Sequence, residues 1–240
     1  MIIRPDELRK NWNVVPRAVL HVGAHEAEES PLYESLDWSP VIWVEAQPNL
    51  AEGLRKNLDP RSNRVIEAAI WDVSGKKMSL HVTSNSQSTS LLNLGTHSKT
   101  YPNISVVGEI EVETKRLDEL IDMQEMPDFI NLDIQGVELR ALESLGNLLK
   151  RLNYIYLEVN WREVYKDCAK VWEVDRYLST FGFHRATTRW FIRPGWGDAL
   201  YLNNKVKKRS INQRYKNAIC AFRFYYPQLV ALFSKMFRKK

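Results

Sequence analysis

Short apolar segments alternate with segments of helical periodicity through the first two hundred residues, and this alternation restricts the chain to few folds. The apolar runs fall at residues 18–22, 41–45, 64–70, 128–132 and 154–159. The segments with helical spacing of apolar residues fall at 28–36, 48–58, 137–149 and 170–181. Strands that are apolar throughout are typical of a parallel sheet covered by helices on both faces. We therefore predict an α/β fold with a mostly parallel sheet.

Two segments in the middle of the chain have a different pattern. Residues 77–83 and 110–115 alternate apolar and polar side chains, as half-exposed strands do. Between them, residues 84–90 are polar, and we expect a loop over the binding site in which Ser88 contacts substrate. Residues 184–186 and 199–202 can close the sheet.

Positive charge is concentrated at the end of the chain. From Lys205 to Lys240 there are eleven Lys and Arg and no Asp or Glu, whereas the rest has 23 basic and 29 acidic residues, a net charge of −6. We predict a domain at 1–204 and a basic, helical, amphipathic tail at 205–240. Such a tail suits an anionic membrane surface. Packing on the domain or on a second subunit is an equal alternative, and no nucleic-acid partner is expected because no base-reading motif is present.

The chain has no evident export or membrane signal. The N-terminal segment MIIRPDELRKNW has charges where a secretory signal has its apolar core. No apolar run approaches the roughly 18 residues of a membrane-spanning helix. Two cysteines, Cys168 and Cys220, are too few for a disulfide framework or a zinc site. We predict a cytoplasmic protein, with peripheral membrane contact through the tail as a further expectation.

Polar residues end every predicted apolar strand. These endings are His21 to His25, Glu45, Asp72, Asp133 and Glu158 to Asn160. Ligands bind beyond the carboxyl ends of parallel strands, so this edge is the predicted site. Glu45 can accept hydrogen bonds from both hydroxyls of a ribose, or it can cap the helix that begins at Pro48. Gly23 lets the backbone approach a ligand closely.

The turn after the first strand disfavours a pyrophosphate. It reads Gly23-Ala24-His25-Glu26-Ala27-Glu28 and lacks the full G-x-G-x-x-G pattern. Glu26, Glu28 and Glu29 place negative charge where a pyrophosphate would need the positive end of a helix. A ribose-bearing cofactor without phosphates, such as S-adenosylmethionine, fits this turn better than NAD or FAD.

Six short segments, in this order, carry a family resemblance. They are His21-Val22-Gly23-Ala24-His25, Trp43-Val44-Glu45-Ala46-Gln47-Pro48, Ala69-Ile70-Trp71-Asp72, Arg116-Leu117-Asp118-Glu119-Leu120, Asn131-Leu132-Asp133-Ile134-Gln135-Gly136-Val137-Glu138 and Leu157-Glu158-Val159-Asn160. Over about residues 17–202 the chain resembles the FkbM-type methyltransferases, a branch of the class I S-adenosylmethionine-dependent methyltransferases. His21 departs from the acidic residue that is commoner in the family, and Ala27 departs from a glycine.

The resemblance implies a Rossmann-like, seven-stranded sheet with a reversed last strand. It also implies methyl transfer, usually to a hydroxyl oxygen on a sugar, a glycan or a natural-product scaffold. The residues expected at the cofactor are His21, Gly23, Ala24, Glu45, Ala46, Asp72 and Asp133. The residues expected at the substrate are Glu138, Glu158, Asn160 and Ser88.

A hydroxyl acceptor has to lose its proton, and His25 and Asp133 are the candidate bases. Asp133, Glu158 and Asn160 are oxygen ligands that could hold Mg²⁺, but no metal is expected.

Two other functions stay open. One is an NAD-dependent or nucleotide-sugar enzyme on a similar sheet, and the other is a catalytically silent domain tethered by its tail. The residues do not identify the methyl acceptor or the oligomeric state.

Overall fold

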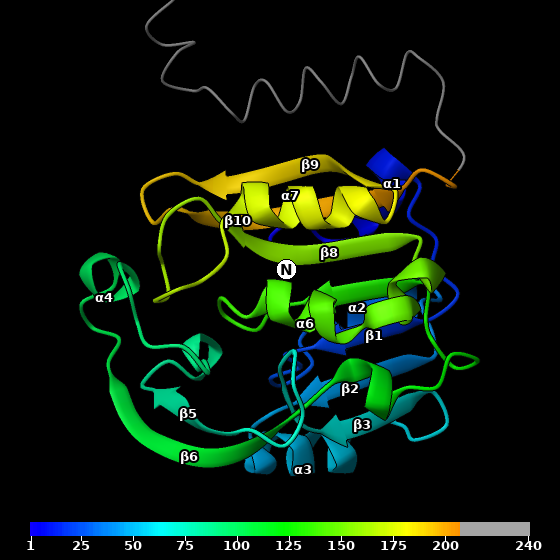
Figure 1. Cartoon of the computed structure of the whole chain (residues 1–240). Helices are drawn as coiled ribbons and strands as arrows, with labels where there is room; N and C mark the ends of the chain where they lie inside the picture. Colours follow the sequence, from blue (N-terminus) through cyan, green and yellow to red (C-terminus); the bar gives the residue numbers. More distant parts are fainter. Residues whose placement is uncertain (207–240) are drawn as a thin grey trace, which may run out of the picture.

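A seven-stranded sheet lies at the centre of the computed structural model, which describes residues 1–206 (Figure 1). Its strands lie in the order β3–β2–β1–β7–β8–β10–β9. Their bounds are β1 Val19–Val22, β2 Val41–Glu45, β3 Asn63–Glu67, β7 Phe129–Leu132, β8 Tyr154–Asn160, β9 Phe183–Phe191 and β10 Trp196–Asn203. β10 is antiparallel to both of its neighbours, whereas the other pairings are parallel. The predicted mostly parallel, Rossmann-like sheet with a reversed last strand is confirmed.

A smaller sheet lies beside the first and has the order β4–β6–β5. Its strands are β4 Ala69–Ile70, β5 Lys77–Thr83 and β6 Val106–Lys115. The prediction of one strand over 64–70 is wrong, because this segment forms two strands in different sheets. β3 pairs with β2 in the large sheet, and β4 pairs with β6 in the smaller sheet. The segment between β5 and β6 contains η1 Ser86–Ser88 and α4 His97–Thr100. Figure 1 shows α4 on the side toward which the arrowheads of β1 and β2 point.

Helices cover both faces of the large sheet. They are α1 Pro5–Trp12, α2 Ser30–Ser35, α3 Pro48–Asn57, α5 Leu117–Leu120, α6 Glu138–Ser144, η2 Gly146–Arg151 and α7 Val171–Thr180. α3 begins at the proline that the sequence indicated, where a fixed φ suits the first helical residue. The predicted helix over 137–149 is divided into α6 and the 3₁₀ segment η2, and α1 and α5 were not predicted.

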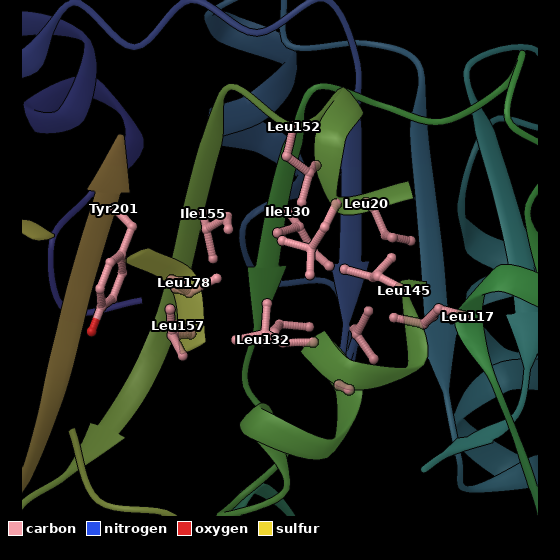
Figure 2. Close-up of a cluster of buried hydrophobic side chains, with 14 of the residues drawn as sticks. Leu20, Leu117, Ile130, Leu132, Leu145, Leu152, Ile155, Leu157, Leu178 and Tyr201 are labelled. Carbon is pink, nitrogen blue, oxygen red and sulfur yellow. The ribbon is translucent and has the colours of Figure 1, made fainter. Parts of the chain in front are cut away.

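Both faces of the sheet are buried in apolar clusters because successive residues of a strand point to opposite sides. Leu20 and Ile130 belong to the cluster under α6 and α7 (Figure 2). Their neighbours Val19 and Phe129 belong to the other cluster, which includes residues of α1, α2 and α3. Burial on both faces explains the continuous apolar runs, and it gives the strand ends a rigid support.

The predicted basic tail, 205–240, lies outside the described residues except for its first two positions, and the boundary at 204 stays a prediction. Cys168 is a buried free thiol, and Cys220 also lies outside the described residues. In residues 1–206, none of the helices has the length and apolar character required to cross a lipid bilayer.

Candidate functional site

Two adjoining cavities lie at the edge of the large sheet where β1, β2 and β7 end. A narrow cavity has a volume of about 70 Å³ and a wide cavity a volume of about 530 Å³. Both are lined by Gly23, His25, Gln87, Asp133 and Gln135. The shared walls make them two compartments of one cleft.

The narrow cavity combines apolar walls with two carboxyl groups, those of Glu45 and of the shared residue Asp133. Its apolar lining comes from β1, β2, β4, β5 and segments that adjoin these strands and β7. It consists of Val22, Val44, Ala46, Ala68, Ala69, Ile70, Leu80, Leu91, Ile134 and Val137. Glu45, the last residue of β2, is the carboxylate that lines this cavity alone. A slot of this kind suits a flat heterocycle joined to a sugar, because the walls take the ring and the carboxylate takes hydroxyl groups.

Glu45 is held in place by backbone amides. Its side chain is 6% exposed, Oε2 accepts a hydrogen bond from the N–H of His25 at 2.9 Å, and Oε1 accepts one from the N–H of Gln47 at 2.9 Å. Burial raises the pKa of this carboxyl group. Each carboxylate oxygen has a second lone pair for a ligand. One side chain can therefore both steady the start of α3 and bind ribose.

Gly23 brings the ends of β1 and β7 together. Its φ is +85°, and a Cβ atom placed on it would lie 2.0 Å from the carbonyl oxygen of Asp133. Any side chain here would be strained in conformation and would push the two strand ends apart. The glycine thus sets the position of Asp133 at the boundary between the two cavities.

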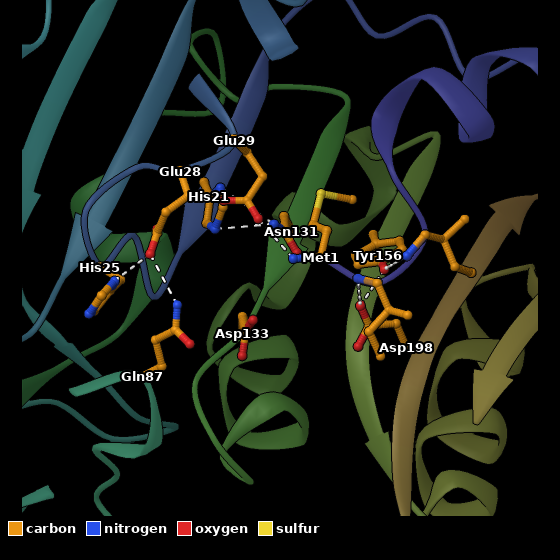
Figure 3. A network of polar contacts seen from close by, with 12 residues as sticks. Met1, His21, His25, Glu28, Glu29, Gln87, Asn131, Asp133, Tyr156 and Asp198 are labelled. Atoms are coloured by element: carbon orange, nitrogen blue, oxygen red, sulfur yellow. Dashed lines mark hydrogen bonds and ion pairs between the residues drawn. The ribbon is translucent and has the colours of Figure 1, made fainter. Parts of the chain in front are cut away.

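The turn after β1 is tied to the segment that follows β5. The imidazole of His25 lies with Nδ1 2.7 Å from Oε1 of Glu28 and with Nε2 2.7 Å from Oγ of Ser86. Gln87 donates from Nε2 to the same Glu28 oxygen at 3.1 Å (Figure 3). Ser88, also on this segment, is buried on the wall of the wide cavity. These contacts hold the polar segment over the cleft.

The wide cavity is acidic. Its wall contains the carboxyl groups of Glu28, Glu29, Asp133, Glu158 and Asp198. Among the described residues, no Lys or Arg lines it. Burial raises the pKa of Asp133 and, with repulsion from neighbouring carboxylates, raises that of Glu158 well above its usual range. Burial likewise raises the pKa of Asp198 to about 6.

Asp198 and Gln135 are two wall residues that the sequence reasoning missed. Asp198 accepts hydrogen bonds on Oδ2 from the hydroxyl of Tyr156 and, at 2.7 Å, from the N–H of Ile2. It lies near the start of β10, and because β10 is reversed, its start lies at the same edge as the ends of the parallel strands. The reversed last strand that the family resemblance implies was the signal that could have identified Asp198 as a site residue. Gln135 donates to Asp133 at 2.6 Å and accepts from the hydroxyl of Tyr165.

The structure brings most of the predicted site residues to the cleft. Those on its walls are His21, Gly23, Ala24, His25, Glu45, Ala46, Ser88, Asp133 and Glu158. His21 lies 4.9 Å from the Trp43 ring in a stacked arrangement, and its Nε2 is 3.1 Å from the amide nitrogen of Asn131. Burial lowers the pKa of His21 to about 4, so the imidazole is a neutral part of the wall.

Three predicted residues do not line either cavity. Asp72 pairs with Arg140 at 2.7 Å, because the chain has left the large sheet at β4. Glu138 accepts the amide N–H groups of Ile134 and Gly136 before α6, and burial raises its pKa to about 7. Asn160 lies 1% exposed beside Glu158, to which its side chain donates at 3.2 Å. The first two positions thus have local structural contacts where the sequence suggested ligand contacts.

Metal-binding geometry is limited in residues 1–206. One group of three side chains, His25, Glu26 and Glu28, has its potential ligand atoms within 4.8 Å of one another. This group is on the turn after β1, and both nitrogens of His25 already have partners. Asp133 and Glu158, considered above for Mg²⁺, form no such group with a third acidic, imidazole or thiol side chain in the described part of the chain.

Comparison with known proteins gives one family match. The family described as "Methyltransferase FkbM domain" matches residues 21–185. No curated protein sequence matches the chain. Similar solved structures include a candidate tRNA methyltransferase from Streptococcus pneumoniae, with 14% identity over 92% of this chain and 78% of that chain and a TM-score of 0.49. They also include the magnesium protoporphyrin IX methyltransferase of Synechocystis PCC 6803 with bound S-adenosylmethionine, with 10% identity over 78% and 69% and a TM-score of 0.42.

Proposed function

This chain belongs to the FkbM methyltransferase family, and from that premise we propose that it transfers a methyl group from S-adenosylmethionine to a hydroxyl oxygen of a sugar, glycan or other natural product. The observation that carries the proposal is the two-compartment cleft. The narrow cavity, with its apolar walls and the buried carboxylate of Glu45, joins the wide, polar cavity. Asp133 lies where the two meet.

The chemistry of the narrow cavity fits S-adenosylmethionine. Its apolar walls take an adenine ring, and Glu45 takes the ribose hydroxyls. Glu28 and Asp133, on the wall of the adjoining cavity, suit a cofactor that is positively charged beyond the ribose. A pyrophosphate would be repelled by the same carboxylates. When bound, the cofactor supplies a methyl carbon that its sulfonium makes electrophilic.

The wide cavity is the proposed acceptor compartment. Two aromatic rings on its wall, Phe191 and Trp196, lie 4.8 Å apart, and the Phe191 side chain is 45% exposed. Rings of this kind can stack on the face of a sugar. The polar side chains of the wall supply hydrogen-bond partners for its hydroxyl groups.

Asp133 is the proposed base for the acceptor hydroxyl. It lines both compartments, and burial raises its pKa toward the range in which a carboxylate accepts a proton efficiently. Gln135 donates to its Oδ1 at 2.6 Å and orients the group. Both ring nitrogens of His25 are engaged by Glu28 and Ser86, so we assign His25 to holding the segment over the cleft.

Calorimetric titration of S-adenosylmethionine into the full chain and into two matched variants tests the proposal. Glu45 and Glu67 are partners in the β2–β3 register, but Glu67 is 40% exposed and pairs with Arg55. Glu45→Gln should weaken binding by about tenfold or more, which is about 1.4 kcal/mol. Glu67→Gln should leave it unchanged.

Other results would favour the alternatives. Absence of S-adenosylmethionine binding to the unmodified protein would overturn the proposal and favour a silent domain. Binding of NAD in its place would favour an NAD-dependent enzyme. Equal effects of the two substitutions would show that Glu45 does not hold the ribose.

A further inference from the structure

The wide cavity has two acidic ends. Glu28 and Glu29 follow β1 and lie beside the residues shared with the narrow cavity. Glu158 and Asp198 come from β8 and β10, two strands that contribute no residue to the narrow cavity. A cofactor that extends from the narrow cavity past Gly23 meets the first end. The second end, formed by Glu158 and Asp198, is left for the acceptor.

The second end has more acidic than basic groups on the cavity wall in residues 1–206. No Lys or Arg lines the cavity in the described residues. The amino group of Met1 pairs with Glu29 at 2.8 Å, and its charge also acts on Asp198. The hydrogen bonds to Asp198 reach Oδ2, and the one to Glu158 reaches Oε1. Oδ1 of Asp198 and Oε2 of Glu158 therefore remain as acceptors for a ligand.

His97 provides an independent indication of a ligand. It is 5% exposed, it lines the wide cavity, and its Nδ1 has no hydrogen-bond partner in the described part of the chain. Its ring lies 5.0 Å from Tyr101 and 5.4 Å from Tyr165. A buried polar atom without a partner is costly, and a ligand donor would satisfy it. Burial lowers the pKa of His97, which keeps the ring uncharged and leaves one ring nitrogen as an acceptor.

We infer that the methyl acceptor carries a protonated amine, as an amino sugar does, and that Glu158, Asp198 and His97 bind its N–H and O–H donors. This inference rests on the proposed methyl-transfer function and narrows its acceptor class. Five carboxyl groups and one ammonium, that of Met1, line the cavity in residues 1–206, so an ammonium group on the acceptor adds positive charge where negative charge is in excess. Phosphorylated sugars and nucleic acids are excluded by repulsion from the same carboxylates.

Titration of a matched pair of sugars tests the inference. Three probes are used. The first is the deacetylated disaccharide of glucosamine, and the second is N,N′-diacetylchitobiose, which has the same rings without the charge. The third is glucose 6-phosphate, an anionic sugar. Each is titrated into the full chain with S-adenosylhomocysteine present and again without it. The deacetylated disaccharide should bind at least about tenfold tighter than the acetylated one. Glucose 6-phosphate should bind most weakly, and the preference for the amine should shrink as salt is added.

Substitutions show which side chains cause the preference for the amine-bearing disaccharide. Glu158→Gln and Asp198→Asn should each remove most of the preference for the amine, and His97→Phe should weaken both disaccharides. Glu111→Gln, on the exposed face of β6 where it pairs with Lys77, is the control for general attraction to an acidic protein and should leave the preference intact. If one cavity variant fails to fold, the other variant and the salt dependence of the unmodified protein still test the inference.

The outcomes separate this inference from the proposed function. Equal binding of the two disaccharides, preference for the phosphate, or no binding of either would overturn the amine-bearing acceptor, even if S-adenosylmethionine binds through Glu45. Preference for the amine in a protein that does not bind S-adenosylmethionine would support the amine site and overturn methyl transfer.

Discussion

Asp198 of β10 lies directly opposite Glu158 of β8 in the antiparallel register, and both side chains are more than nine-tenths buried. Like charges that face each other on a sheet are destabilising. Two such groups at a cleft, with raised pKa values, are typical of a functional site and not of packing alone. A cation bound beside them would remove part of this destabilisation.

Ionisation of Asp198 should lower stability as the pH rises. Burial raises its pKa from 3.8 to about 6, so between these values the folded state binds more protons than the unfolded state. The free energy of unfolding therefore falls from about pH 4 to about pH 6, by about 3 kcal/mol in total. Asp198→Asn removes the ionisation, so its stability relative to the unmodified protein should improve between pH 4 and pH 8 in urea titrations.

Tyr156→Phe serves as the comparison for Asp198→Asn. The hydroxyl of Tyr156 donates to Asp198 and lowers the pKa of that carboxyl group. Its removal should move the loss of stability to higher pH while the ionisation itself is kept. A stability difference between Asp198→Asn and the unmodified protein that stays constant from pH 4 to pH 8 would contradict the prediction.

Protonation of His21 should lower the stability of the fold as the pH falls. Burial lowers its pKa from 6.5 to about 4, so in this range the unfolded state binds a proton that the folded state does not. The free energy of unfolding falls by about 3 kcal/mol as the pH drops through this window. His21→Phe, which keeps a ring against Trp43, should lose less stability between pH 7 and pH 4.5. Tyr33→Phe keeps the imidazole and should retain the loss, and parallel curves for all three proteins would disprove the assignment.

Replacement of Gly23 should be far more harmful than replacement of Gly53. Gly23→Ala forces a side chain into a left-handed conformation and against the Asp133 carbonyl, and it should cost about 2–4 kcal/mol of stability. Gly53 lies within α3 and has no atom within 4 Å of an added Cβ, so Gly53→Ala should add up to about 1 kcal/mol. Urea unfolding of the two variants measures both changes. Equal effects would show that the turn tolerates a side chain.

The basic tail gives a prediction that rests on the sequence alone. Residues 205–240 carry eleven positive charges and no negative side chain, so removal of 205–240 should abolish sedimentation with vesicles that contain phosphatidylglycerol. Vesicles of phosphatidylcholine alone should bind neither protein. The truncated protein should keep its thermal unfolding temperature, and unchanged sedimentation would contradict a membrane role.

Much of the fold could be predicted because burial on both faces of a parallel sheet leaves a local signal. Every position of β1 and β2 is buried, and the resulting continuous apolar runs in the sequence predict Val19 to Val22 and Val41 to Glu45 as strands. Glu45 and Asp133 could be assigned to one edge because parallel strands end on the same side. The division of the predicted strand over 64–70 was not predictable, since an apolar pair such as Ala69 and Ile70 does not reveal which strand it will join.

The sequence by itself determined most strands of the large sheet and several of its helices, the common edge at which the polar strand endings meet, and the family of the chain. These properties depend on periodicity and on short motifs, which are local. Only the tertiary structure decided that Asp198 faces Glu158, that Asp72 pairs with Arg140 away from the cleft, and that the carboxyl groups of the wide cavity have raised pKa values. Those outcomes depend on pairing and burial between residues far apart in the chain, and no local pattern records them.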